Sequence, residues 1–138
     1  MEKYSINELS IGMSSTIKKA FTEDDVLSFS KVSGDLNPAH IDEVYASKTM
    51  FKSRIVHGML VGSLFSAILG TKLPGLGSIY TNQTLKFLRP VYLNEEITAT
   101  VTVKELMIEK NRVILDCVAT NEKGEVVLVG EAIIMPPR

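Results

Sequence analysis

The feature that most constrains the fold is an uncharged, mostly apolar segment that runs from His57 to Gly70. In a helical conformation this segment carries large apolar side chains over a wide arc, at Leu60, Val61, Leu64, Phe65, Ile68 and Leu69. Such a helix has to be covered on nearly all sides, because apolar surface is unfavourable in water. We therefore expect it to lie at the centre of the molecule.

Small residues form a stripe along the same segment. Gly58, Gly62, Ser66 and Gly70 recur at intervals of four, so they share one face of the helix. A stripe with so little side-chain bulk lets a sheet, a second backbone or a ligand approach closely. Helix–sheet packing and a ligand-lined face both fit this pattern.

Residues 77–136 have the alternation that is typical of β-strands. Ile97, Ala99, Val101 and Val103 alternate with polar residues, and similar runs lie at 79–87, 113–119 and 126–135. The turn residues 121–124 separate the last two runs. Strands joined by turns this short pair antiparallel. A further short strand is expected near residues 14–18.

The first half of the chain, residues 1–75, is expected to be mostly helical or irregular. Thr22 and Asp25 fit the N-terminal cap of a helix that Gly34 would end, and a short helix should run from Ile41 to about Lys48. Combined with the strands, the central helix predicts an α+β fold in which a curved antiparallel sheet wraps around one long helix. No linker or repeat interrupts the chain, so we expect residues 1–138 to form one domain.

Composition narrows the kind of protein. The net charge of −1 predicts no general attraction to nucleic acid or to an anionic membrane. A hydrophobic content of 45% favours a buried subunit interface or an apolar ligand channel. The single Cys117 suits a reducing cytoplasm. Met1–Tyr4 does not begin a signal peptide, and Ile55–Gly70 is too short and too polar to span a membrane, so we expect a soluble cytoplasmic protein.

The best candidate for a catalytic site is an Asp and a His in a loop of turn-forming residues. Gly34 frees the backbone before Asp35, and Asn37 and Pro38 favour a turn before His40. We expect this stretch to have no regular structure. A carboxylate and an imidazole that reach one water molecule can perform acid–base chemistry. Taken singly, an ordinary turn for Asp35 and a structural or surface role for His40 are the alternatives.

The start of the apolar helix supplies a second candidate feature. Its first backbone N–H groups are unpaired, and Gly58 allows a substrate oxygen to approach, so its N–H could stabilise an oxyanion; helix packing is the alternative. His57 has no carboxylate close in sequence, which favours a helix-start or packing role. No spacing supports a metal site built from His40, His57 and an Asp, so no metal is expected. No Gly-x-Ser-x-Gly motif surrounds Ser63 or Ser66.

The sequence resembles the MaoC-like hydratases, and among them the (R)-specific enoyl-CoA hydratases. The segments that carry this resemblance are Phe29–His40 (FSKVSGDLNPAH), Ile55–Leu60 (IVHGML), Ser63–Ser66 (SLFS), Leu73–Tyr80 (LPGLGSIY) and Phe87–Val91 (FLRPV). The resemblance implies a hot-dog fold and a homodimer with two acyl-thioester sites near the subunit interface. It also implies the reversible syn hydration of trans-2-enoyl-CoA to (R)-3-hydroxyacyl-CoA.

The same resemblance assigns roles to the acid–base pair. Asp35 would be the principal base, and His40 would orient the water and relay the proton. The Gly58 N–H would stabilise the thioester oxyanion. Ala39 departs from the family pattern, which usually has Leu, Ile or Val there, and this removes bulk beside the pair.

The remaining assignments concern the substrate. Ser66 would support the site, Asn37 would shape the loop that carries the pair, and Leu69 would form the floor of the acyl pocket. The expected partner is an acyl-CoA thioester, with no cofactor, metal, nucleic acid or membrane. Cations available for the phosphates of coenzyme A are Lys48, Lys52, Arg54, Lys86 and Arg89.

Three other functions fit the same features to different degrees. A hot-dog dehydratase acting on acyl-carrier-protein or branched enoyl-CoA substrates would share the acid–base pair and the oxyanion donor. A hot-dog thioesterase commonly has an acidic residue on the central helix, and residues 57–70 contain none. A non-catalytic acyl-CoA-binding or dimerisation module would have no need of both Asp35 and His40.

Overall fold

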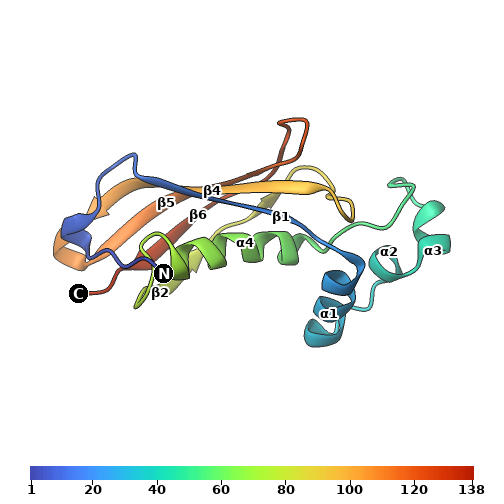
Figure 1. Cartoon of the computed structure of the whole chain (residues 1–138), viewed down its shortest axis with the longest axis horizontal. Coiled ribbons are helices and arrows are strands. Elements are labelled where there is room, and N and C mark those ends of the chain that lie inside the picture. The colour runs from blue at the N-terminus through green and yellow to red at the C-terminus, as the bar shows by residue number, and fades with distance from the viewer.

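The computed structural model describes all 138 residues and shows one antiparallel sheet and a long helix (Figure 1). The strands are β1 (Ser14–Ala20), β2 (Ile79–Gln83), β3 (Lys86–Phe87), β4 (Glu96–Met107), β5 (Arg112–Thr120) and β6 (Val126–Met135). The helices are α1 (Glu23–Ser33), α2 (Pro38–Ile41), α3 (Glu43–Ser47) and α4 (Gly58–Thr71), with short 3-10 turns η1 (Ile6–Glu8) and η2 (Ile108–Lys110).

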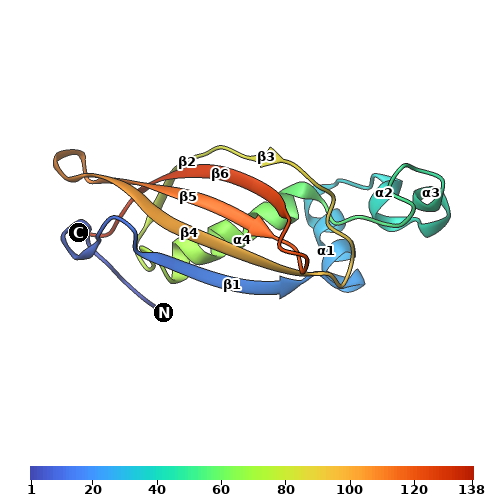
Figure 2. The same ribbon diagram turned by 90° about the horizontal axis from the view of Figure 1, so that it is seen from above.

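The sheet has the strand order β1-β4-β5-β6-β2, and β3 pairs beside β2 with the same strand, β6. Every pairing is antiparallel. The sheet curves over α4, while α1, α2 and α3 lie together beyond one end of it (Figures 1 and 2). This is the predicted hot-dog arrangement, so the fold class inferred from the sequence is confirmed.

The core lies between the concave face of the sheet and α4. The alternating residues Ile97, Ala99, Val101 and Val103 of β4 point inward and are almost completely buried. Phe65, Ile68 and Leu69 of α4 pack into the same cluster. The period-two and helical patterns therefore meet in one continuous core, as the sequence predicts.

The caps of α1 are those that the sequence predicts. The Thr22 side chain accepts a hydrogen bond from the backbone of Asp25, whose carboxylate in turn accepts one from the Thr22 backbone. Gly34 ends the helix in the left-handed conformation, with φ of +80°. This ending turns the chain toward the loop that carries Asp35.

The structure corrects two details of the sequence analysis. The loop from Asp35 was expected to have no regular structure, yet His40 lies in the one-turn helix α2, because the Asn37 side chain caps it and Pro38 starts it. The strand expected at 79–87 is divided into β2 and β3. The Thr84 N–H donates to the Glu131 carbonyl, but the Glu131 N–H donates to the Thr84 side-chain oxygen, and this interrupts the regular ladder.

None of the helices combines the length and the apolar character that a membrane span requires.

The packing of α4 against the sheet yields a first prediction. Phe65 is fully buried between them, so Phe65→Ala should lower the free energy of unfolding by about 3–5 kcal/mol in urea titrations at fixed protein concentration. Val32→Ala, at a position on α1 that is 85% exposed, is the control and should change it by less than about 0.5 kcal/mol. Equal effects of the two substitutions would contradict this placement of the core.

Candidate active site

A cavity of about 780 Å³ opens where the α1–α2 loop, the start of α4 and the segment after β3 meet. Apolar side chains make up most of its wall, among them Phe29, Val61, Phe87 and Leu128. The few polar groups are gathered at one place, where Asp35, His40 and His57 line the cavity together with Gly58. An apolar cavity with a small polar cluster is the usual form of a small-molecule site.

Local hydrogen bonds hold Asp35 in its turn. Its backbone N–H donates to Ser33 Oγ at 3.1 Å, and its carboxylate Oδ1 accepts from the Asn37 N–H at 3.1 Å. The Asn37 side chain in turn accepts from the Ala39 N–H at 3.0 Å and so caps α2. The side chain of Asp35 is 48% exposed, which leaves Oδ2 free at the mouth of the cavity.

His40 is held by the segment that leads into α4. Its Nδ1 lies 2.7 Å from the carbonyl oxygen of Ile55. A carbonyl oxygen can only accept, so Nδ1 carries a proton and Nε2 faces Asp35. The Ile55 N–H also donates to the Ala39 carbonyl at 3.2 Å, and Arg54 Nε donates to the His40 carbonyl at 2.7 Å. Both the ring and the backbone of His40 are therefore fixed.

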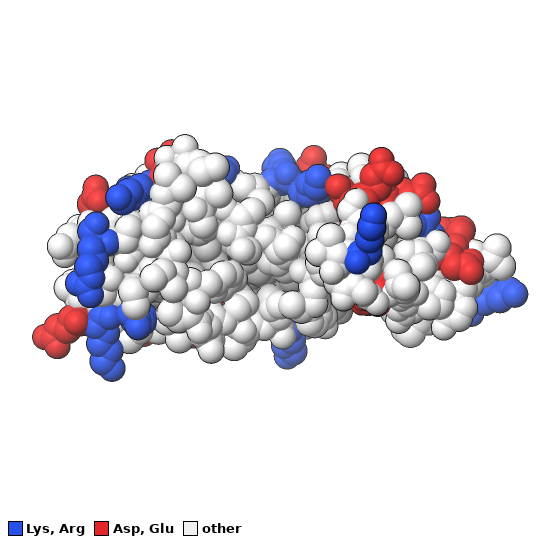
Figure 3. All heavy atoms as spheres, turned by 90° about the horizontal axis from the view of Figure 1, so that it is seen from below, with Lys and Arg blue, Asp and Glu red and all other residues white.

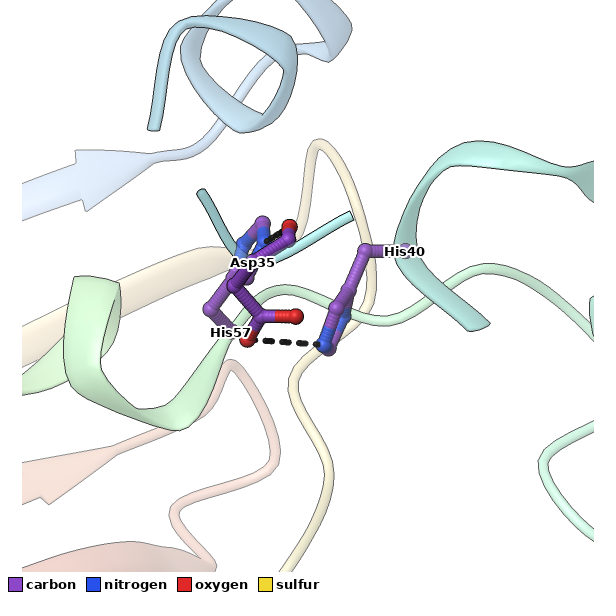
Figure 4. Close-up of side chains that lie close together, drawn as sticks. All are labelled: Asp35, His40 and His57. Atoms are coloured by element: carbon purple, nitrogen blue, oxygen red, sulfur yellow. Dashed lines mark hydrogen bonds and ion pairs between the residues drawn. The ribbon is translucent and has the colours of Figure 1, made fainter. Parts of the chain in front are cut away.

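Asp35 and His40 come together as the sequence predicts (Figure 4). Oδ2 of Asp35 lies 4.0 Å from Nε2 of His40, which is too far for a direct hydrogen bond. A separation of this size fits one water molecule that bonds to both groups. The pair thus has the geometry for shared acid–base chemistry on a single water.

His57 lies immediately beneath this pair. It is the N-cap residue of α4, as expected, and it is 2% exposed. Its Nε2 lies 3.0 Å from Ser30 Oγ and 3.3 Å from the Asp35 carbonyl oxygen, and its ring stacks on that of His40 with centroids 3.9 Å apart. Burial, and to a lesser degree the neighbouring His40, lowers the pKa of His57 below 6.5, which favours the neutral ring.

Gly58 is the first residue of α4 and lines the same cavity. No side chain caps the start of this helix, so its first N–H groups have no acceptor within the chain. A Cβ at position 58 would lie 2.6 Å from the Phe87 ring, so a larger residue there would have to displace this half-exposed ring. Gly58 therefore packs closely against Phe87 and also has a backbone N–H group without an acceptor, so both interpretations from the sequence fit.

Three further residues assigned from the resemblance lie outside the cavity wall. Asn37 caps α2, as described above. Ser66 is on the exposed face of α4, and Leu69 is on its buried face, 1% exposed within the core. The inner wall of the cavity is formed instead by Val61 and Leu128. The substrate-binding roles of the three residues stay predictions.

Two of the five candidate cations have defined partners. Arg89 lines the cavity and pairs with Glu125 at 3.2 Å, with more than half of its side chain exposed. Arg54 is largely buried and pairs with Glu23 at 2.8 Å. Arg89 is thus the cation that a substrate phosphate at the mouth of the cavity would meet, whereas Arg54 supports the backbone of His40.

Asp35, His40 and His57 each bring one potential metal ligand within 4.8 Å of the others. However, Nδ1 of His40 and Nε2 of His57 are engaged with carbonyl oxygens. The Nδ1 atom of His57 is buried and has no partner. Asp35 Oδ2 and His40 Nε2 are the two unbonded ligand atoms that face each other, whereas the unpaired Nδ1 of His57 is buried. This arrangement favours an acid–base pair over a metal centre that needs three protein ligands.

Sequence reasoning did not predict the contact between His57 and the acid–base pair. Ser30 and His57 are 27 positions apart, so no local pattern relates them. The one feature of the sequence that could have indicated this contact is a serine, Ser30, on the apolar face of α1, one turn after Val26.

Comparison with known proteins agrees with the fold. The family model described as MaoC like domain matches residues 8–126, so this chain belongs to the MaoC-like domain family. An (R)-specific enoyl-CoA hydratase from Rhodospirillum rubrum is 48% identical over 91% of this chain and 87% of that protein.

A solved structure, the (R)-hydratase from Aeromonas caviae involved in PHA biosynthesis, has a TM-score of 0.92. It is 40% identical, over 94% of this chain and 98% of that one. A mitochondrial 3-hydroxyacyl-[acyl-carrier-protein] dehydratase from Solanum lycopersicum is also 40% identical, over 96% of this chain and 81% of that protein. The relatives thus include acyl-thioester hydratases and dehydratases.

The lowered pKa of His57 predicts how stability depends on pH. Because the folded state holds this ring neutral, the unfolded chain binds more protons below pH 6.5. The contribution of neutral His57 to the free energy of unfolding is complete above pH 6.5, and it is lost as the pH falls through the pKa of His57 in the folded state. The free energy of unfolding should therefore decrease between about pH 7.5 and 5.5, and less steeply in His57→Phe, which has no titratable ring.

Urea titrations at several pH values measure this dependence at one protein concentration. Glu8, Asp25 and Glu125 also have lowered pKa values, but these start from 4.5 or 3.8, so they titrate below the chosen range. Equal slopes for the wild type and His57→Phe would show that burial of His57 does not favour its neutral form.

Proposed function

We propose that this chain is an (R)-specific enoyl-CoA hydratase that adds water reversibly to trans-2-enoyl-CoA, giving (R)-3-hydroxyacyl-CoA. The observation that carries the proposal is the position of Asp35 Oδ2 and His40 Nε2, 4.0 Å apart at the wall of an apolar cavity. The unpaired start of α4 lines the same cavity at Gly58. The relatives named above have activities of this class.

In the proposed reaction, Asp35 and His40 act on one water molecule. Asp35 takes a proton from the water as its oxygen bonds to C3, and the electrons of the C2–C3 double bond move toward the thioester carbonyl. His40 enters this step as the imidazolium, with Nδ1 donating to Ile55 and a second proton on Nε2. The Nε2 proton passes to C2, and the proton taken up by Asp35 then returns to Nε2. The Nδ1 bond to Ile55 keeps Nε2 directed at the water throughout. Dehydration is the reverse.

The thioester oxygen gains negative charge as the water adds, because C2 becomes an enolate carbon. We assign the stabilising donor to the N–H of Gly58 at the positive end of α4. A residue with a side chain at this position would collide with Phe87, so glycine both admits the sheet and leaves the backbone N–H accessible. Asp35 and His40 thus activate the water, and the Gly58 N–H stabilises the negative charge on the thioester oxygen.

Catalysis by the pair is tested with crotonyl-CoA, by following the loss of enoyl absorbance and the configuration of the product. The wild type should yield the (R) product. Asp35→Asn and His40→Gln should each lower kcat by about 10²- to 10⁴-fold, because each removes a group that transfers a proton.

Asp24→Asn is the matched control, because Asp24 is exposed on α1 and has no ion pair or side-chain hydrogen bond, and it should keep wild-type activity. Near-native activity of both pair variants would contradict the assignment.

The same acyl group carried on acyl carrier protein tests the second candidate, a carrier-protein dehydratase, which the tomato relative favours. Faster turnover of that substrate than of crotonyl-CoA would indicate that acyl carrier protein, and not coenzyme A, carries the acyl group.

We also propose that the enzyme is a homodimer whose second subunit covers the open face of α4. This face carries Met59, Ser63, Ser66, Ala67 and Gly70, and no charged residue of α4 lies on it. Figure 3 shows the molecule from this side, with a mostly uncharged middle and charges gathered toward the ends and one rim. A second copy would remove this surface from water.

The edge of the sheet supports the same interface. β2 is the last strand in the sheet order, so its outer edge is unpaired. Ile79, Tyr80 and Phe87 nearby are between 42% and 55% exposed although they are large and apolar. Because Met59 lines the cavity and also lies on the open face, a second subunit there would extend the cavity wall. We assign the enzyme to the cytoplasm, where its single buried Cys117 would stay reduced.

The dimer yields a prediction that uses size and activity together. Ala67→Arg places a charge on the open face of α4 without disturbing the helix, and it should produce a monomer with much lower activity. Analytical ultracentrifugation measures the size, and circular dichroism checks the fold. Val32→Arg, on the exposed side of α1, is the control and should stay dimeric and active. A fully active Ala67→Arg monomer would contradict the interface.

A further inference from the structure

We propose that His57, held by Ser30, is a positioning residue that fixes both Asp35 and His40 for the reaction. The proposal rests on the proposed hydratase function, but it concerns contacts that the mechanism itself does not use. His57 touches the backbone of one member of the pair and the ring of the other. Ser30 connects this histidine to α1.

The hydrogen bonds of His57 define its tautomer. The Asp35 carbonyl can only accept, so the bond at 3.3 Å requires a proton on Nε2. The same N–H is shared with Ser30 Oγ at 3.0 Å. In the neutral ring Nδ1 is then a bare lone pair, and it is buried without a partner. Neither nitrogen is free to exchange a proton with a substrate, so His57 does not act as acid or base.

The ring of His57 is held between two others. The His40 ring stacks on it at 3.9 Å with an angle of 26°, and the Phe29 ring meets it edge-on at 4.8 Å. The Ile55 bond fixes one edge of His40, whereas the stack fixes the plane of its ring. Together these contacts leave Nε2 one direction, toward Asp35 Oδ2.

Ser30 is an unusual residue at its position on α1. It lies one turn after the fully buried Val26 and is itself 2% exposed, at a place where an apolar side chain would pack well. A buried hydroxyl without a partner is unfavourable, and the side-chain partner of Ser30 is His57. Ser30 and the neighbouring Phe29 thus connect α1 to the site through the same histidine.

The test compares three variants with the wild type. His57→Phe keeps a ring beneath His40 but removes the N–H, His57→Gln restores an N–H without the ring nitrogens, and Ser30→Ala removes only the hydroxyl. His57→Phe should lower kcat for crotonyl-CoA by about 10- to 100-fold with little change in KM, because a misplaced pair slows the chemistry. His57→Gln should recover part of this loss, and Ser30→Ala should show a smaller loss than His57→Phe.

Two controls separate positioning from loss of stability. Val26→Ala removes buried volume from the same face of α1 and should lower the melting temperature without changing kcat. Proton NMR of the His40 Nδ1–H reports on the site without any substrate. Its signal should shift and exchange faster in His57→Phe and return toward the wild type in His57→Gln.

The outcomes distinguish the proposals from each other. Wild-type kcat and an unchanged His40 signal in His57→Phe and Ser30→Ala would overturn the positioning role. If the wild type fails to hydrate any enoyl thioester, the proposed function fails, and the NMR comparison alone decides whether His57 positions His40. Loss of kcat in Val26→Ala equal to that in Ser30→Ala would also overturn the role, since stability alone would then explain it.

Discussion

The site depends on a pair of hydrogen bonds that join α2 to the segment before α4. Nδ1 of His40 donates to the Ile55 carbonyl at 2.7 Å, and the Ile55 N–H donates to the Ala39 carbonyl at 3.2 Å. They join the Asp35 loop to the start of α4 together with the bond from His57 to the Asp35 carbonyl. With them, the imidazole that faces the water and the helix start that faces the thioester belong to one rigid unit. These bonds also define which nitrogen of His40 is available, because the carbonyl accepts only from a protonated Nδ1.

The sheet places that unit at the mouth of an apolar cavity. α4 lies in the curve of the sheet with its large side chains inward, so its N-terminal end opens beside β3 and its small residues face outward (Figures 1 and 2). Phe87 of β3 packs so closely on Gly58 that the two elements cannot separate without losing the cavity wall. The charge-free face of α4 reaches this opening at Met59, which also lines the cavity. A second subunit there would complete the wall around the acyl chain and shield the reacting atoms from water.

Much of this arrangement could be predicted from the sequence, because it follows from local periodicity. The strand alternation of residues 97–103, the caps of α1 and the apolar α4 each depend on residues close in the chain. Asp35 and His40 were identified because a short motif contains both. The position of His57 could not be predicted, since it depends on Ser30, 27 positions away, and on a ring stacked from another element. The position of Leu69 was also not predicted. The apolar residues of α4 are divided between the cavity and the sheet, and Leu69 lies on the side that packs in the core.

The central claim is that Asp35 and His40 add a single water to one face of the double bond. Hydration of crotonyl-CoA in D₂O, followed by NMR of the isolated 3-hydroxy product, tests this most directly. If both groups act from the same side, the hydroxyl at C3 and the deuterium at C2 will be on the same face, in one diastereomer with (R) configuration at C3. Addition to opposite faces, or an equal mixture of diastereomers at C2, would contradict the shared water.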